Sequence, residues 1–365
     1  MSRSEAISLQ GIEHRYEERI VLQELDLSIR SGEMLCMLGA SGCGKSTIVR
    51  LIAGLERPYR GSISLFGKDA SRIPSHERRI AMVSQTAGCY DHLSVEENLL
   101  LSEQLARAER ADPTGPNRSE VIEGLELQGH LQQRPSQLSG GLSQRLAIAR
   151  AFLSGRPILL MDEPLAHLHE SLRQPIRDLV RAWQRESGRT CLYITHDSME
   201  ASRISDRIAV LYDGQVKQID APENVYDQPA CRQVAELVGT PSIQWFNPRA
   251  IGLASESARI GIRPRDWRCI SILPAESAIG PPDADSQDIR LHGLIVDSRR
   301  IESEWWLRIE FGAAQKLLAI LPRWLSADSG GIDLPSPQHP DGNDPKTFSP
   351  GCKISLACDQ FVRSR

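Results

Sequence analysis

Short, continuous apolar runs recur along the first two thirds of the chain. Four of them predict strands buried on both faces: Met34–Leu38, Ile80–Val83, Ile158–Met161 and Cys191–Ile194. Segments with a helical pattern lie between these runs, at 47–53, 94–108, 119–127 and 142–154. Strands that alternate with helices predict a mostly parallel α/β core.

Two further patterns indicate antiparallel strands. Residues 21–30 alternate between apolar and polar positions, which is typical of a strand with one buried face. Ile208–Tyr212 and Val216–Ile219 are joined by an Asp-Gly dipeptide, which favours a tight hairpin turn.

The pattern changes near Pro241 and Pro248, beyond which strand-like runs prevail: Ile260–Ile262, Leu291–Val296, Trp305–Glu310 and Leu317–Ile320. Residues 325–350 are dense in Gly, Pro, Ser and Asp and predict a mobile loop. A chain of 365 residues is long enough for two domains. We therefore predict an α/β domain over 1–240, with a helical subdomain at about 86–155, and a β-rich domain over 241–365.

Composition limits the classes of function. The net charge of −4 provides no basic field for nucleic acid. No apolar run approaches the roughly 20 residues that span a bilayer, and the first residues, MSRSEAISLQ, do not resemble a signal segment. We expect a cytosolic protein unless a partner holds it at a membrane. The eight cysteines predict free thiols in a reducing compartment, and their spacing does not predict a structural metal.

The sequence GASGCGKST at 39–47 lies between a buried strand and a helix, as the P-loop pattern GxxxxGK[ST] requires. Its glycines let successive backbone N–H groups point at one anion, and the helix N-terminus adds a partial positive charge. Lys45 supplies a full charge for the β- and γ-phosphates, and the Ser46 hydroxyl is suited to ligate Mg²⁺. The predicted nucleotide-binding residues are Gly39, Ala40, Ser41, Gly42, Cys43, Gly44, Lys45, Ser46 and Thr47.

An acidic pair, Asp162 and Glu163, directly follows the buried strand Ile158–Met161. A carboxylate at a strand tip beside a P-loop can hold Mg²⁺ directly or through water, which is the role predicted for Asp162. The adjacent Glu163 can polarise an attacking water as general base. An acidic pair alone could be a solvated strand end, so this prediction depends on the P-loop.

The stretch LSGGLSQRLAIARA at 138–151 resembles the signature sequence of the ATP-binding cassette (ABC) family. Its Ser and Gly residues form a second helix start rich in N–H groups. The resemblance implies a head-to-tail dimer with two ATP molecules sandwiched between the copies. In that dimer Ser139, Gly140 and Gly141 of one copy complete the ATP site of the other.

Other elements of the family are present in the expected order. Tyr16 matches the aromatic residue that stacks on adenine, although a packed surface tyrosine remains the alternative. Gln85 matches the glutamine that senses Mg²⁺ and the attacking water, and it is therefore a predicted catalytic residue and metal ligand with Ser46 and Asp162. His196 matches the histidine that contacts the γ-phosphate.

Within the family the chain looks closest to the importer ATPases of the maltose, glycerol-3-phosphate, iron and polyamine type. The motifs that carry this likeness are RRIAMVSQ at 78–85, DRIAV at 206–210, APENVY at 221–226 and GIRP at 261–264. The last motif implies a C-terminal OB-like regulatory domain. Segment 86–100 matches the place where a membrane subunit docks. Its candidate contacts, for which simple helix packing remains the alternative, are Tyr90, His92 and Leu93.

Two positions depart from the family pattern: Leu142 stands where the family usually has Gln, and His169 where it usually has Asp. Leu142 is expected to matter little, because the anion is held by Ser139 and backbone amides. The aspartate that the family usually has at the position of His169 helps to couple the two halves of the dimer, so this replacement casts more doubt on that coupling. Because histidine titrates near pH 6.5, we hypothesise that activity depends on pH through this residue.

The sequence thus predicts an ATPase that uses ATP and Mg²⁺ and works as a homodimer or beside another cassette subunit. Transmembrane permease subunits and, indirectly, an extracytoplasmic solute-binding protein are its expected partners at the cytoplasmic face of the membrane. Sugar or glycerol-3-phosphate is the leading solute, with ferric iron, polyamine and other small solutes as alternatives. A weakly active regulatory subunit is a further alternative. Cytosolic ABC proteins that act on ribosomes or DNA are disfavoured, because this chain has one cassette and no long inserted coiled coil.

Overall fold

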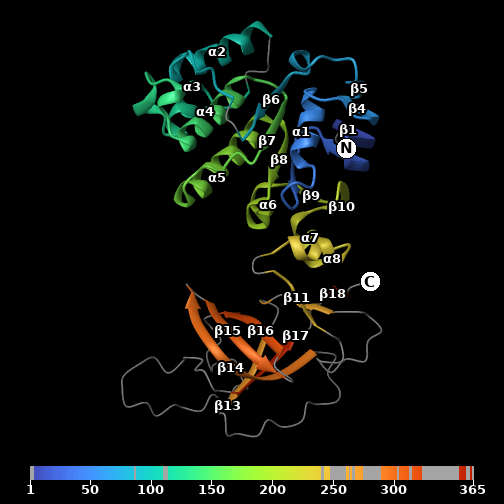
Figure 1. The fold of residues 1–365 in the computed structure, drawn as a ribbon. Helices are drawn as coiled ribbons and strands as arrows, with labels where there is room; N and C mark the ends of the chain where they lie inside the picture. The colour runs from blue at the N-terminus through green and yellow to red at the C-terminus, as the bar shows by residue number, and fades with distance from the viewer. Residues whose placement is uncertain are drawn as a thin grey trace. The chain divides into compact units, whose positions relative to one another are not determined.

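The structure is a computed structural model of the whole chain. It describes residues 4–85, 88–109, 114–239, 242–246, 260–262, 264, 268–273, 289–301, 304–311, 315–322, 353–358 and 362–363. The predicted loop at 325–350 lies outside these residues. The chain divides into two compact units, Met1–Leu237 and Val238–Arg365 (Figure 1).

A six-stranded sheet of order β10-β9-β3-β8-β7-β6 forms the centre of the first unit. Five of its strands run parallel, and β10 pairs antiparallel with β9. Every residue of β3, β7 and β8 is buried, which explains why these strands appear in the sequence as unbroken apolar runs. The predicted parallel α/β core is confirmed. The strands are β3 (Met34–Leu38), β6 (Ile80–Val83), β7 (Ile158–Asp162), β8 (Thr190–Thr195), β9 (Arg207–Tyr212) and β10 (Gln215–Asp220).

A second, antiparallel sheet has the order β2-β1-β4-β5. Its strands are β1 (Glu5–Tyr16), β2 (Arg19–Arg30), β4 (Arg60–Leu65) and β5 (Lys68–Asp69). The alternation at 21–30 predicts β2, but β1 escapes prediction because several register shifts interrupt its pairing and its period of two. One hydrophobic core joins this sheet to the six-stranded sheet through α1 (Lys45–Ala53), which Figure 1 shows between them.

Three helices lie together on one side of this unit (Figure 1): α2 (Val95–Ala108), α3 (Arg118–Gly124) and α4 (Gly140–Leu153). Capping boxes fix the starts of α2 and α3, at Ser94 and Asn117. The predicted helix at 119–127 is too long. The chain leaves the helix at Leu125, and Glu126 takes a φ of 50° that no right-handed helix allows.

Four helices were not expected from the pattern: α5 (Glu170–Ser187), α6 (Ser198–Ile204), α7 (Pro222–Asp227) and α8 (Arg232–Leu237). In α5 the buried face carries Arg177, Arg181 and Gln184 beside Val180 and Trp183. Buried polar residues interrupt the apolar stripe from which a helix is recognised.

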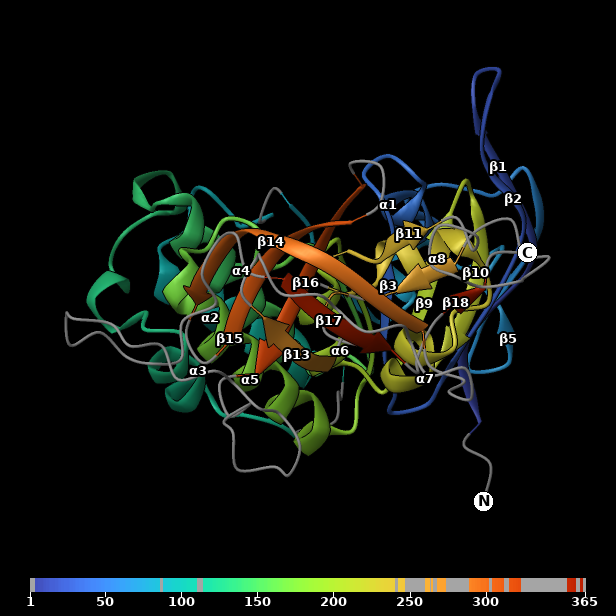
Figure 2. The ribbon, with the colours of Figure 1, turned by 90° about the horizontal axis from the view of Figure 1, so that it is seen from below.

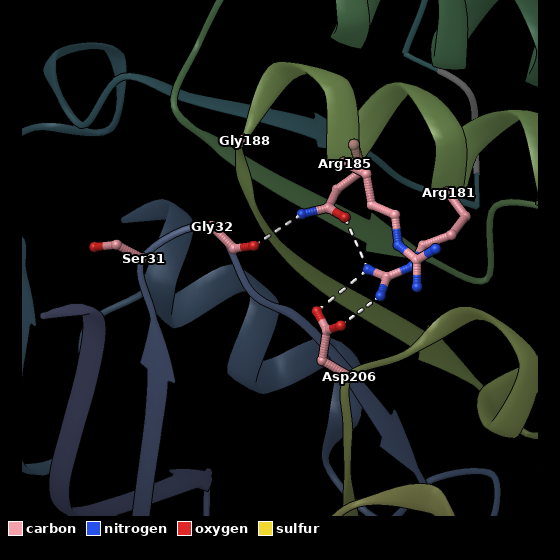
Figure 3. A pocket seen from close by; sticks show the side chains of 7 residues that line it. Ser31, Gly32, Arg181, Arg185, Gly188 and Asp206 are labelled. Atoms are coloured by element: carbon pink, nitrogen blue, oxygen red, sulfur yellow. Dashed lines mark hydrogen bonds and ion pairs between the residues drawn. The ribbon is translucent and has the colours of Figure 1, made fainter. Parts of the chain in front are cut away.

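The polar face of α5 contributes to a cleft of about 430 Å³ at the amino ends of the parallel strands (Figure 3). Arg181 points from α5 toward Asp206, which precedes β9, and both guanidinium Nη atoms bond its carboxylate. The same carboxylate accepts a hydrogen bond from the Met34 amide at 2.8 Å. These bonds, of which Figure 3 draws those between Arg181 and Asp206, tie α5 to the starts of β3 and β9.

In the second unit the described elements are all strands. One sheet has the order β11-β12-β18 and the other, fully antiparallel, the order β13-β17-β14-β15-β16; Figure 2 shows β14, β15 and β16 side by side. The predicted runs after residue 260 all lie in strands, while the OB-like fold stays a prediction. The bounds are β11 (Gln244–Phe246), β12 (Ile260–Ile262), β13 (Arg268–Leu273), β14 (Ile289–Ile301), β15 (Glu304–Phe311), β16 (Gln315–Pro322), β17 (Lys353–Cys358) and β18 (Val362–Arg363).

The cysteines and the hydropathy of the helices bear on the expectations drawn from composition. Cys36 and Cys191 are buried free thiols, as expected, whereas the side chain of Cys269 lies outside the description. Among the described helices, none combines the length and apolar character that a membrane crossing requires.

The C-terminus of α1 depends on one buried arginine. Arg78, only 8% exposed, donates to the carbonyls of Leu51 and Ile52 in the last turn of α1 at 2.8 Å. It also donates to the carbonyls of Ala70 at 2.8 Å and Ile73 at 3.0 Å. These bonds satisfy helix-end carbonyls that have no partner within the helix.

We predict that Arg78→Ala lowers the free energy of unfolding of the first unit by about 3 kcal/mol, because buried carbonyls would lose a charged donor. The measurement is urea unfolding followed by circular dichroism at helical wavelengths, since all described helices lie in this unit. Arg60→Ala is the control, because its side chain is 69% exposed and contacts Glu13 only at 3.7 Å. Equal urea midpoints for Arg78→Ala and Arg60→Ala would contradict the role of Arg78 in stabilising the end of α1.

Candidate functional site

A cleft of about 730 Å³ opens where the parallel strands β3, β6 and β7 end. It brings together predicted residues from four separate segments: the P-loop, Tyr16, Gln85 and Glu163. The P-loop side chains and glycines that line it are Ser41, Gly42, Gly44, Lys45, Ser46 and Thr47. Carboxyl ends of parallel strands meet at one edge of the sheet, so segments far apart in sequence converge there.

The P-loop joins the buried strand β3 to α1, as its pattern requires. Gly44 precedes the helix with a φ of 107°, a backbone conformation that residues with a Cβ rarely adopt. Gly39 is restricted by space, since a Cβ there would lie 2.5 Å from the Leu211 carbonyl oxygen. Glycine at these two places therefore allows the backbone path that the loop follows between β3 and α1.

Lys45 is the first residue of α1 and is 5% exposed. Its ammonium donates to the carbonyls of Gly39 at 2.7 Å and Ala40 at 2.9 Å, both within its own loop. It forms no ion pair with any acidic residue of the described chain. A buried cation held only by carbonyls keeps an uncompensated charge, which favours an anion in the cleft.

Asp162, the last residue of β7, is 5% exposed, and its Oδ1 has no hydrogen-bond partner among the described residues. Burial raises the pKa of the Asp162 carboxyl, and the nearby charge of Glu163 adds to this increase. The hydrogen bond from the Ser46 hydroxyl and the charge of Lys45 lower the same pKa, but by less. A carboxylate oxygen with no donor, beside a hydroxyl and a phosphate-binding loop, is suited to a hard cation.

Glu163 and His196 follow the neighbouring strands β7 and β8 and therefore meet. His196 Nδ1 lies 3.4 Å from Glu163 Oε1 and its side chain is 63% exposed, but of the two only Glu163 is among the residues that line the cleft. Glu163 has a φ of 48°, an uncommon conformation for a residue with a Cβ, while its amide donates to the Ile194 carbonyl at 3.1 Å. Backbone strain of this kind persists where the surrounding structure enforces it, commonly at functional sites.

The loop that carries His196 is fixed by a carboxylate that motif reasoning missed. Glu200, in α6, accepts hydrogen bonds from the hydroxyls of Thr195 at 2.5 Å and of the fully buried Tyr193 at 2.6 Å. The Thr195 hydroxyl in turn accepts from the Asp197 amide at 3.1 Å. In the sequence, the one feature that links Glu200 to this loop is its position four residues after His196.

Gln85 lines the cleft just after β6, and residues 86–87 beyond it lie outside the described residues. The strand end is held by α4, where the buried Gln144 donates to the Ser84 carbonyl at 3.3 Å. The helix that starts with the signature sequence thus contacts the backbone next to Gln85.

The signature residues lie apart from the cleft of their own chain. Ser139 caps α4, and its hydroxyl accepts from the Leu142 amide at 3.3 Å. Ser139 and Gly140 are exposed, and neither they nor Gly141 are among the residues that line the described cleft. Gly141 packs under the loop after Glu163, because a Cβ there would lie 3.2 Å from the His167 carbonyl oxygen.

The two departures from the family pattern have different surroundings. His169 is the N-cap of α5, and its Nδ1 lies 2.9 Å from the Ser171 hydroxyl and accepts from the Ser171 amide at 3.4 Å. Aspartate is also a preferred N-cap residue, so this position is compatible with either side chain. Leu142 is half-buried in the first turn of α4.

The candidate docking residues form a small surface cluster. The guanidinium of Arg150 lies 4.4 Å from the centre of the Tyr90 ring, and the ring of His92 is 6.1 Å from that of Tyr90. Tyr90 and His92 are exposed and Leu93 is half-buried. Their role as contacts stays a prediction.

Comparison with known proteins gives consistent matches. The ABC transporter family profile matches residues 22–166. The chain is 38% identical to the sn-glycerol-3-phosphate import ATP-binding protein of Rhizobium johnstonii, over 71% of each chain. It is 37% identical to a spermidine/putrescine import ATP-binding protein of Pseudomonas aeruginosa, over 74% of this chain and 79% of that protein.

Two solved structures share the fold. One is a dimeric ATP-binding cassette in a post-hydrolysis state bound to ADP and phosphate; it is 29% identical, covers 59% of this chain and 98% of its own, and has a TM-score of 0.52. The other is the ATP-binding subunit of an ABC transporter, 27% identical, with 60% and 91% coverage and a TM-score of 0.52.

We predict that Asp162→Asn stabilises the ligand-free protein at neutral pH by about 1 kcal/mol. The raised pKa means that the ionised carboxylate is less favourable in the folded than in the unfolded chain. Its cost to stability is therefore absent at low pH and appears as pH rises through the folded pKa. Thermal unfolding without nucleotide or Mg²⁺ measures the change, and an Asn variant that melts below the parent at pH 7 would contradict this account.

Proposed function

We propose a function from one premise: the chain belongs to the ABC transporter family of ATP-binding subunits. It is an ATPase that drives an import system, in which it binds and hydrolyses ATP while separate membrane subunits carry the solute. The observation that supports this most is the cleft itself: Lys45, which is bonded to carbonyls of its own loop, and Glu163 both line it, and His196 lies 3.4 Å from Glu163 at the end of the adjoining strand.

The P-loop binds the triphosphate of ATP. Its amides and the start of α1 present N–H groups to the phosphates, and Lys45 adds the full positive charge that its own loop leaves unpaired. Tyr16, at the end of β1 and 44% exposed, offers its ring to adenine at the other end of the cleft.

The residues present are suited to Mg²⁺. Asp162 has an unpaired buried oxygen, Ser46 is bonded to the same carboxylate, and Gln85 lines the cleft nearby. In the described chain no three His, Cys, Asp or Glu side chains group to hold a metal, so phosphate oxygens of the substrate would supply the remaining ligands. When bound, Mg²⁺ neutralises charge on the β- and γ-phosphates.

Glu163 acts as general base toward the water that attacks the γ-phosphate. It stands at the tip of β7, beside the position that Lys45 assigns to the phosphates, and its side chain is 18% exposed. His196 stabilises the negative charge that develops on the transferred phosphoryl group. The proximity of its ring to Glu163 also keeps the base directed into the cleft.

The active form is a head-to-tail pair. In this chain the cleft is open, and the N–H groups at the start of α4 lie on an exposed surface elsewhere. A second copy, or another cassette subunit, would bring its Ser139, Gly140 and Gly141 against the γ-phosphate. The dimeric arrangement named for a 29% identical cassette supports this pairing.

Permease subunits hold the protein at the cytoplasmic face of the membrane, and they receive the extracytoplasmic solute from a binding protein. The surface around Tyr90, His92 and Leu93, in segment 86–100, is the proposed docking site. The second unit serves as an OB-like regulatory domain, in keeping with its antiparallel sheets.

The solute is a sugar or glycerol-3-phosphate. The C-terminal motif supports both solutes, and a relative named for sn-glycerol-3-phosphate import adds support for the second. Polyamine is supported by relatives named for spermidine and putrescine import. Ferric iron has no such support among these relatives. A weakly active regulatory subunit remains the second candidate because of His169 and Leu142.

Glu163→Gln is predicted to reduce ATP hydrolysis at least a hundredfold while ATP and Mg²⁺ still bind, because the amide cannot accept a proton from water. With ATP, the variant should elute as a dimer in size-exclusion chromatography, while phosphate release stops. Glu223→Gln, at an exposed carboxylate in α7, is the control and should behave as the parent. Near-normal turnover of Glu163→Gln would refute the general-base role.

Glu200→Ala is predicted to lower kcat about tenfold and leave KM for ATP nearly unchanged, because Thr195 would no longer hold the His196 loop. Tyr193→Phe is the matched variant: it removes one hydroxyl that bonds Glu200 but leaves the Thr195 bond. Steady-state ATPase kinetics distinguish them. A kcat as low in Tyr193→Phe as in Glu200→Ala would show that the bond to Thr195 is not what matters.

A further inference from the structure

The phenol of Tyr16 is bonded to other side chains of the protein. Its hydroxyl donates to Glu56 Oε2 at 2.7 Å and lies 3.5 Å from the Thr47 hydroxyl in α1. Burial raises the pKa of Tyr16, and the neighbouring Glu56 carboxylate contributes to the same increase. The phenol therefore stays protonated at neutral pH and acts as a donor.

Glu56 is itself held by Arg50 and lies close to His14. Arg50 Nε donates to its Oε1 at 2.5 Å, and His14 Nε2 lies 3.2 Å from its Oε2. Burial opposes ionisation of Glu56, but the hydrogen bonds from Tyr16 and Arg50 outweigh it and lower the pKa of the carboxyl. An ionised acceptor makes the bond from the Tyr16 hydroxyl stronger than a bond between neutral groups.

The backbone fixes Glu56 relative to the P-loop. Glu56 follows the αL residue Gly54 that ends α1, and the Arg50 carbonyl accepts from the amides of Leu55 at 2.9 Å and Glu56 at 3.4 Å. Since α1 runs from Lys45 to Ala53, the lysine proposed to bind phosphate stands at the start of this helix and the anchor of Tyr16 lies three residues beyond its end.

The ring of Tyr16 has a second support. His14, two residues earlier on β1 and only 8% exposed, meets it edge to face, with ring centroids 5.0 Å apart and planes at 86°. The hydroxyl anchor and this contact together restrict the two torsions of a side chain that is otherwise 44% exposed.

We propose that Glu56 is a positioning residue for adenine: it holds Tyr16 in the orientation that stacks on the base and sets that ring at a fixed distance from the P-loop. This rests on the proposed role of Tyr16 in ATP binding. A side chain ordered before the ligand arrives loses less freedom on binding, so the anchor favours affinity. The effect should be confined to ligands that carry a base.

The test compares ATP with inorganic tripolyphosphate, each with Mg²⁺, by isothermal titration of the full chain. We expect Glu56→Ala to raise the Kd for ATP about fivefold, the loss of one charge-assisted hydrogen bond. The Kd for tripolyphosphate and the kcat at saturating ATP should stay unchanged. Glu56→Gln, which keeps an acceptor oxygen for the phenol, should lie between parent and Ala.

Two further variants separate the anchor from general damage. Tyr16→Phe retains the ring but lacks the hydroxyl, so it should match Glu56→Ala, and the double variant should be no weaker than either single one. Glu13→Ala is the control, since this carboxylate on the same strand pairs only with Arg60, at 3.7 Å, and does not touch Tyr16.

Each outcome decides the proposal. If Glu56→Ala weakens tripolyphosphate as much as ATP, Glu56 supports α1 rather than adenine, and the proposal is overturned. If Tyr16→Ala weakens ATP while Tyr16→Phe and Glu56→Ala do not, the anchor fails but the proposed role of Tyr16 stands. If Tyr16→Ala binds ATP as the parent does, the role of Tyr16 itself fails, and the anchor with it.

Discussion

The buried ammonium of Lys45, bonded only to carbonyls of its own loop, is the interaction on which the site depends. Keeping a cation in such a place costs free energy, which the polyphosphate proposed to bind there would recover. The rest of the unit maintains this arrangement. The fully buried β3 fixes one end of the loop, and α1 fixes the other. Arg78 secures the far end of the helix through its terminal carbonyls.

The two edges of the parallel sheet differ in how their charges are compensated. At the amino ends, Arg181 pairs with Asp206 and Arg207 Nε with Glu33 Oε1 at 2.6 Å, and the pKa of Asp206 is lowered because hydrogen bonds from Arg181 and Met34 outweigh burial. At the carboxyl ends, Asp162 has a raised pKa and an oxygen with no donor. At the first edge these ion pairs compensate the charges and stabilise the fold, although the buried Arg181 Nε has no hydrogen-bond partner among the described residues. At the second edge the Asp162 oxygen is the group that we propose a ligand would satisfy.

Sequence reasoning found the elements whose signal is local. Strands buried on both faces appear as apolar runs, and the P-loop needs its residues at fixed spacing. The bulged β1 and the polar-faced α5 escaped because burial there does not follow a simple period. Glu56 and Glu200 escaped for another reason: each acts through a contact that the fold creates. Tyr16 and Glu56 are 40 residues apart, and only the packing of β1 beside α1 brings them together.

The packing of the signature turn (Ser139, Gly140 and Gly141) connects the two ATP sites of the proposed pair through each copy. Gly141 lies directly under the His167 carbonyl, in the loop between Glu163 and the His169 cap of α5. In the proposed head-to-tail pair, the signature turn of one copy would bind the ATP held by the other copy. Within its own copy, the same turn rests on the loop that follows Glu163, the proposed general base. A side chain at 141 would push that loop, since a Cβ would approach its backbone to 3.2 Å. Glycine at 141 therefore fits this packing without a shift of the loop, in addition to the anion binding proposed for it, and a motif alone does not distinguish these two roles.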